Sequence, residues 1–313
     1  MHLAKRGLIN GWLNDAQRKP TVEQLQALSR EVHVPFGYFF LDHVPKEDSL
    51  LLQRAVSKSL QGKQPSRELV DTVHDMETKQ AWFSDYRKVH GYGRNRIAYG
   101  YHRVNSRRQL SADNQANAIL NALGLKPEWG AKLTVNSAFA RLQKALNDVG
   151  VTVMFSRFAG GDLLRRLNQN EFRAFVLSDD YAPLIFINSN VGVKAMLFSL
   201  TREMVCLWLG ASELDNDRFG LNDAGAEQTV RQVTQIVIGP ELMSATEPSQ
   251  NTADDSALSA NTALQIDSIF AQAVASSVRA LETTYTDAFT LLNVKNTNEF
   301  DRLIAKAQTA ITR

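Results

Sequence analysis

The chain has 313 residues, 44% of them hydrophobic, which is enough for about two globular units with cores of their own. Its 35 Lys and Arg nearly balance its 33 Asp and Glu, so the formal net charge of +2 indicates no general affinity for nucleic acid or membranes. No apolar run reaches the roughly 18 residues of a spanning helix, and residues 1–20 lack the apolar core of a signal peptide. We therefore expect a cytoplasmic protein with no membrane partner.

Cysteine and histidine are scarce. The single cysteine, Cys206, excludes an internal disulfide framework and a zinc module built from several cysteines. The six histidines stand at positions 2, 33, 43, 74, 90 and 102, so none follows residue 102. A metal site in the remainder of the chain would have no imidazole ligand.

The N-terminal residues 1–45 predict short packed helices. Thr21 follows a proline and is a favourable N-cap, and Gln24 stands where its capping-box partner belongs. Apolar residues then recur at helical spacing, and a second apolar cluster follows over 34–41. Residues 46–110 predict a connector: one long amphipathic helix over 65–89, followed by a basic loop.

The segment 111–243 mixes both kinds of secondary structure, which predicts an α+β domain. Turn formers separate short runs of β-branched and aromatic residues, and apolar residues recur at helical spacing on both sides of them. We expect helices within 111–149, the second capped by Asn136 or Ser137, then strands at 151–156, 172–178 and 183–189 and helices at 193–209 and 227–238. Small polar residues predict a linker over 244–262, and a C-terminal helical region follows over 263–313.

Four segments in order resemble the ImmA/IrrE family, zincin-fold metallopeptidases that are often fused to a repressor-type helix-turn-helix. Residues 12–42 resemble the second half of the helix-turn-helix, and 65–86 resemble the connector. Residues 172–190 followed by 198–210 resemble the peptidase sheet and its active-site helix, and 284–306 resemble the C-terminal helices. The resemblance implies a zincin-like domain with a small twisted sheet packed on helices, behind a truncated helix-turn-helix remnant.

The zinc motif of that family is replaced in this chain. The family's H-E-x-x-H pattern places two imidazoles on one helix face around Zn²⁺, with the glutamate as general base on the bound water. The corresponding residues are Arg202, Glu203, Met204, Val205 and Cys206. The base is kept as a vestigial Glu203, whereas Arg202 stays protonated and cannot bind a cation.

The third ligand position is altered as well. The resemblance implies an acidic ligand on the next helix, where this chain has Ile236. We therefore expect no metal or other cofactor, although zinc is present in active relatives. A rebuilt site would have to draw on carboxylates alone beside Cys206, from Glu213, Asp215, Asp217, Asp223 or Glu227.

We expect structural rather than catalytic roles for Glu203, Cys206 and the basic window 86–108. We expect Glu203 to be a carboxylate paired with a nearby arginine, and Cys206 to be a small buried apolar residue. The window 86–108 is basic and aromatic and has no acidic residue. We expect a solvated loop there, and the alternative is a contact for an anion or nucleic acid. Its candidate residues are Arg94, Arg96, Arg103, Arg107 and Arg108.

These observations favour a pseudo-metallopeptidase that binds a protein without cleaving it. The resemblance implies a transcriptional or mobile-element regulator whose partner is a repressor or a toxin/antitoxin-type protein. An extended peptide could add to the edge of the sheet in such a domain. Two alternatives stay open: an active zinc endopeptidase that cleaves a repressor, and a DNA-binding regulator that uses residues 1–20 and 87–108.

Overall fold

The computed structural model describes residues 19–32, 36–43, 65–98, 110–210, 213–215, 224–246 and 264–312. The chain divides into two compact units, Met1–Asp48 and Ser49–Arg313. Within the described residues, no helix has the length and apolar character needed to cross a membrane.

Among its described residues, the first unit contains one helix and one turn of 3-10 helix. Helix α2 spans Val22–Val32, and η1 spans Phe36–Phe40. The predicted capping box is confirmed: the Thr21 N–H donates to Gln24 Oε1 at 2.9 Å, and the Gln24 N–H donates to Thr21 Oγ1 at 3.3 Å. Residues 1–18, which include most of the segment considered for DNA contacts, lie outside the described residues.

A mixed four-stranded sheet lies at the centre of the second unit, in the order β1-β3-β2-β4. Strand β1 runs parallel to β3, whereas β2 runs antiparallel to both β3 and β4. The three predicted strands are confirmed and the short fourth strand is an addition. Their bounds are Thr152–Ser156 for β1, Ala174–Leu177 for β2, Leu184–Asn188 for β3 and Glu213–Asp215 for β4.

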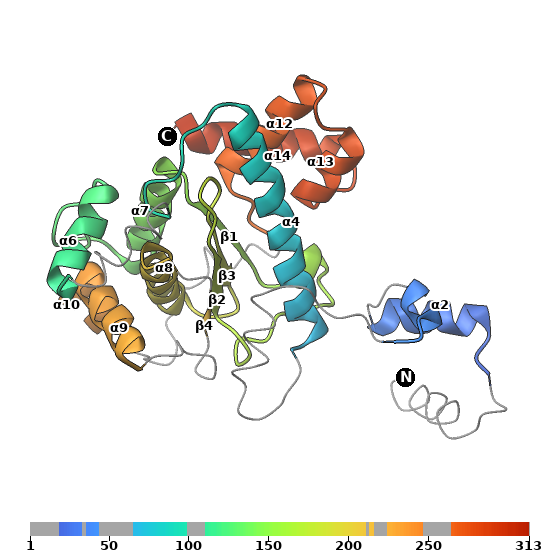
Figure 1. The fold of residues 1–313 in the computed structure, drawn as a ribbon, viewed down its shortest axis with the longest axis horizontal. Helices are drawn as coiled ribbons and strands as arrows, with labels where there is room; N and C mark the ends of the chain where they lie inside the picture. The colour runs from blue at the N-terminus through green and yellow to red at the C-terminus, as the bar shows by residue number, and fades with distance from the viewer. Residues whose placement is uncertain are drawn as a thin grey trace. The chain divides into compact units, whose positions relative to one another are not determined.

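Helices cover both faces of this sheet, so the second unit has three layers (Figure 1). Side chains alternate along each strand: Ile185 and Ile187 enter one core, whereas Phe186 between them enters the other. The first core includes α6 (Ala112–Ala122), α7 (Val135–Asp148), α8 (Val193–Trp208), α9 (Ala224–Ile238) and α10 (Pro240–Thr246). The second includes α4 (Arg67–Val89), α12 (Ser268–Arg279), α13 (Tyr285–Leu292) and α14 (Thr297–Thr312).

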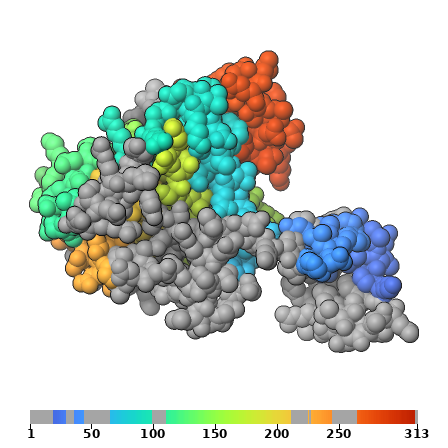
Figure 2. Space-filling model, viewed as in Figure 1, coloured from blue at the N-terminus to red at the C-terminus, as the bar shows by residue number. Residues whose placement is uncertain are grey.

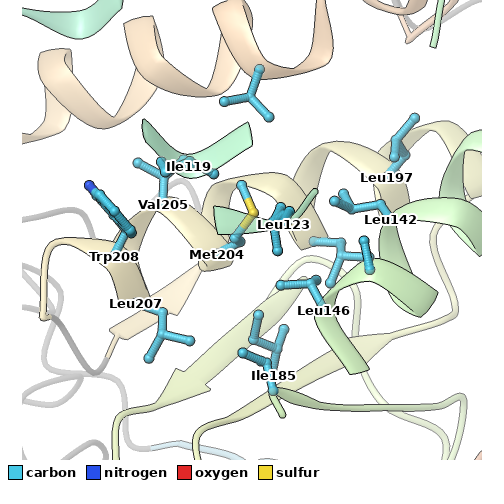
Figure 3. Close-up of a cluster of buried hydrophobic side chains, with 14 of the residues drawn as sticks. Ile119, Leu123, Leu142, Leu146, Ile185, Leu197, Met204, Val205, Leu207 and Trp208 are labelled. Atoms are coloured by element: carbon cyan, nitrogen blue, oxygen red, sulfur yellow. The ribbon is translucent and has the colours of Figure 1, made fainter. Parts of the chain in front are cut away.

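Helix α8 is the central element of the first core. Its apolar side chains contact α7 and the sheet, as Figure 3 shows for Met204, Leu146 and Ile185. Packing on several sides buries every residue of α8 from Ser199 to Trp208. Polar residues of this helix are therefore buried along with the apolar ones.

Helix α4 is not a free connector, because it packs directly on the sheet. Leu69, Val73 and Met76 of α4 belong to the core on this face, as do the C-terminal helices. In the space-filling view of Figure 2, α4 lies directly against those helices. The expected boundaries at residues 110 and 262 therefore do not separate compact units, since α4, the sheet and the C-terminal region all lie in Ser49–Arg313.

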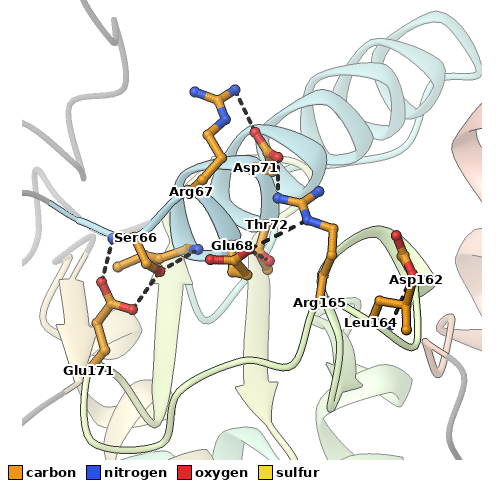
Figure 4. A network of polar contacts seen from close by, with 10 residues as sticks. Ser66, Arg67, Glu68, Asp71, Thr72, Asp162, Leu164, Arg165 and Glu171 are labelled. Carbon is orange, nitrogen blue, oxygen red and sulfur yellow. Dashed lines mark hydrogen bonds and ion pairs between the residues drawn. The ribbon is translucent and has the colours of Figure 1, made fainter. Parts of the chain in front are cut away.

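Ion pairs hold the N-terminal end of α4 to the loop that joins β1 and β2 (Figure 4). Arg165 of that loop contacts Asp71 at 2.5 Å and Glu68 at 3.6 Å. Ser66, the N-cap of α4, donates its hydroxyl and its N–H to Glu171 at 2.6 and 2.7 Å. These contacts fix the helix on the sheet.

Two sequence-based details are corrected. The N-cap of α7 is Thr134, whose hydroxyl accepts from the Ser137 N–H at 3.2 Å, and neither Asn136 nor Ser137 has that role. The predicted linker over 244–262 begins within α10, which continues to Thr246. Residues 247–263 lie outside the described residues.

Candidate functional site

Helix α8 brings together three of the predicted site residues. The i, i+4 spacing of Arg202 and Cys206 places both on one helix face, with Glu203 beside them. All three are buried: Arg202 is 6% exposed, and Glu203 and Cys206 are 0% exposed. The expected burial of Cys206 is thus confirmed.

The Arg202 guanidinium is held by groups from two helices. Its Nη1 lies 2.9 Å from Glu203 Oε1 and 3.8 Å from Cys206 Sγ, while its Nη2 lies 3.2 Å from Glu227 Oε2 on α9. The expected pairing of Glu203 with a nearby arginine is confirmed. We call Arg202, Glu203, Cys206 and Glu227 the Arg202 cluster.

The energetics of the cluster follow from its burial. A buried charge is costly unless a partner of opposite sign and hydrogen bonds compensate for lost hydration. Arg202 satisfies this condition for the fully buried Glu203, and Glu227 adds a second carboxylate at the edge of the cluster. The ion pair between Arg202 and Glu227 therefore links α8 to α9, and the cation between the two helices is a side chain of the protein itself.

Ile236 does not join this cluster, contrary to its predicted place. Its side chain is 38% exposed, whereas Thr234 two residues earlier is fully buried. Glu227 and Thr234 are seven residues apart and so lie on one face of α9. The contact from α9 to Arg202 comes from Glu227. Aligning the sequence with the family motif could not show this, because a shift of one or two residues along α9 changes which side chain faces Arg202.

The residues present do not fit a zinc ion. Zinc sites in proteins combine thiolate, imidazole and carboxylate ligands, and a guanidinium is a protonated group that repels a cation. Arg202 contacts Glu203, Cys206 and Glu227, which are the side chains that could otherwise serve as ligands. Among the described residues, no group of three or more His, Cys, Asp and Glu side chains is placed to hold a metal ion.

The basic window is described only in part. Arg103, Arg107 and Arg108 lie outside the described residues. Arg94 lies 3.8 Å from Asp180 and its Nε lies 3.5 Å from the Tyr181 hydroxyl, so this guanidinium packs along the protein. Arg96 is exposed at the mouth of a cavity.

That cavity, of about 620 Å³, was not anticipated from the sequence. The C-terminal ends of α4 and α7 and the N-terminal end of α12 border it, and Asp267, the N-cap of α12, is among its lining residues. Burial raises the pKa of Asp267 to about 6, although the backbone N–H groups of Phe270, Val153 and Ile269 and the side chain of Asn147 oppose that rise. The sequence signal for Asp267 was its position directly before an apolar helical run.

Comparison with known proteins gives one match. A family model described as a domain of unknown function, DUF8813, matches residues 266–306. This match covers α12, α13 and most of α14. No curated protein matches the chain. No solved structure matches it either.

Proposed function

We propose that the second unit is a zincin-like domain that has lost its metal site and acts by binding a protein partner. The order of elements supports this: a mixed sheet is followed directly by a buried helix, α8, that carries the altered motif. The observation that carries the proposal is the Arg202 cluster. In it, a guanidinium takes up the contacts that a catalytic cation would need.

The proposed partner is a repressor or toxin/antitoxin-type protein, met in the cytoplasm in a transcriptional or mobile-element setting. A strand of such a partner could add to an edge of the sheet. The β1 edge is already used by Gln265, whose N–H donates to the Phe155 carbonyl at 2.8 Å. Strand β4 forms the opposite edge among the described strands, and it is the edge that we propose for the partner.

The decisive experiment measures metal content and proteolysis together. The purified protein is equilibrated with a zinc-containing buffer, dialysed to remove free zinc and analysed for bound metal. It is then incubated with repressor-type substrates with and without chelator. We expect less than one zinc per chain and uncut substrates, and the same result for Glu203→Gln. Zinc-dependent cleavage that disappears in Glu203→Gln would establish an active peptidase and overturn the proposal.

A binding measurement separates the protein-binding proposal from DNA binding. Affinity for the repressor-type protein is measured by titration calorimetry, and affinity for duplex DNA is measured across a salt series. We expect saturable protein binding and no sequence-selective DNA binding, because Arg94 already contacts Asp180 and Tyr181. Tight DNA binding with a steep salt dependence would favour the DNA-binding regulator instead.

A further inference from the structure

The cavity beside Asp267 is separate from the Arg202 cluster. None of the four residues of that cluster lines it, and its lining residues come from α4, the loop that follows α4, α6, α7, β1, and α12 with its N-cap. Small-molecule sites in proteins occupy about 300–1,000 Å³, and the volume of about 620 Å³ lies within that range. Its size alone is compatible with many ligands, so the lining groups decide its chemistry.

Two buried oxygen acceptors line the inner part of the cavity. Asp267 is 3% exposed, and its Oδ1 accepts from the N–H groups of Ile269 at 2.9 Å and Phe270 at 3.0 Å. Its Oδ2 is buried and accepts no well-formed hydrogen bond within the described residues, although the Val153 N–H and the Asn147 side chain lie close enough to lower the pKa of Asp267. Oδ1 of Asn147 also accepts no hydrogen bond within the described residues. Buried acceptors in native proteins rarely lack donors, so this place calls for a ligand group with N–H or O–H donors.

The mouth of the cavity has the opposite chemistry. Arg87, Arg94 and Arg96 all line it, and Arg96 is exposed. Asp148 is an acidic lining residue, but it is paired with Lys144 at 3.3 Å. Arg87 donates to the Gly150 carbonyl at 3.0 Å and Arg94 contacts Asp180, so Arg96 is the guanidinium that we assign to an anionic ligand group. Phosphate is an anion that arginine binds especially well.

Aromatic rings also line the cavity. Tyr86 and Tyr92 both line the cavity, with ring centroids 6.5 Å apart, and Tyr92 is 51% exposed. The Arg87 guanidinium lies 5.3 Å from the Tyr92 centroid, which fixes that ring beside the basic mouth. A flat ligand ring can pack against such an exposed aromatic face.

We propose that this cavity binds a nucleoside phosphate, with guanine as the preferred base. The phosphate lies at Arg96, the base packs against Tyr92, and its donor edge faces Asp267 and Asn147. Guanine carries a ring N–H and an amino group side by side, which matches two acceptors that line the same cavity. The site is independent of the proposed loss of zinc, because it shares no residue with the Arg202 cluster.

Titration calorimetry on the full-length protein tests the ligand class. The probes are GMP, IMP, guanosine and inorganic phosphate. We expect GMP to bind most tightly, IMP about tenfold more weakly because it lacks the amino donor, and guanosine more weakly because it lacks the phosphate. Absence of GMP binding at millimolar concentration would overturn the proposal. Phosphate that binds as tightly as GMP would reduce the cavity to a simple anion site and overturn it as well.

Three variants test the residues. Asp267→Asn keeps a good N-cap for α12 while it can replace the Oδ2 acceptor by a donor, so GMP affinity should fall at least about tenfold. Arg96→Gln alters an exposed side chain and should weaken GMP binding about tenfold without affecting guanosine. Arg141→Gln, an exposed change on α7 outside the cavity, is the matched control and should bind normally. Unchanged GMP affinity in Arg96→Gln would contradict the proposal even if Asp267→Asn failed to fold.

Discussion

Arg202 on α8 reaches Glu227 on α9 with an Nη2 to Oε2 distance of 3.2 Å, across 25 residues of sequence. The same guanidinium contacts Glu203 on its own helix, so one buried cation serves carboxylates from two helices. This arrangement explains how α8 can keep a fully buried glutamate in a core that is otherwise mostly apolar.

Removing this cation should destabilise the fold. Arg202→Met keeps much of the side-chain volume but leaves Glu203 charged and uncompensated in the core, and we expect a loss of about 3–5 kcal/mol in the free energy of unfolding. The double variant Arg202→Met/Glu203→Gln removes that charge too and should recover part of the loss. Urea unfolding monitored by circular dichroism measures both values. Equal stability of the single and double variants would show that Glu203 does not depend on Arg202.

Introducing two imidazoles on α8 should create a zinc site that uses Glu227. In Arg202→His/Cys206→His, two imidazoles would share one face of α8, and Glu227 already projects toward it. We expect zinc at 100 times its dissociation constant to raise the free energy of unfolding by about 2.7 kcal/mol.

Two further variants of that double variant identify the carboxylate. Adding Glu227→Gln should abolish zinc binding, whereas adding Ile236→Glu should not improve it, because position 236 is exposed. Zinc binding that requires Ile236→Glu would mean that position 236, and not Glu227, is the position of α9 that faces α8. Calorimetric titration with zinc provides the measurement.

Asp267 should make stability depend on pH between about 4 and 6. Burial raises its pKa from 3.8 to about 6, so the folded state binds the proton more tightly than the unfolded state does. The contribution of Asp267 to the free energy of unfolding should therefore fall as pH rises through this window, by up to about 3 kcal/mol. Asp267→Asn keeps the cap and should lose this dependence, and it should be at least as stable as the parent at pH 7. Parallel stability curves for the two proteins over pH 4–7 would refute the assignment.

Gly150 should not tolerate a side chain. Its φ is +81°, and a Cβ there would lie 2.9 Å from both Nη1 and Nη2 of Arg87. Gly150→Ala should therefore cost about 1–3 kcal/mol through backbone strain and displacement of Arg87. Gly93→Ala is the control, because that position has an ordinary φ and a Cβ there would have no atom within 4 Å, and thermal unfolding should show little change. Similar melting temperatures for the two variants would contradict this account.

Much of the secondary structure could be predicted from local patterns. The capping box at Thr21 and the amphipathic run of α4 depend on residues a few positions apart, and the structure has both where the sequence predicts them. The three longer strands were equally clear, since each is a run of β-branched and aromatic residues between turn formers. Strand β4 was missed because its three residues, Glu213–Asp215, carry no such pattern.

The sequence by itself determined that no imidazole is available to a site in the second half of the chain, because no histidine follows residue 102. Only the tertiary structure decided that Glu227 rather than Ile236 faces Arg202, and that Asp267 and Asn147 line one cavity with Arg96. Local patterns report interactions over one or two helical turns. The relative phase of α8 and α9, and the meeting of α4, α7 and α12, depend on how whole helices pack on the sheet, which involves contacts between residues far apart in the chain.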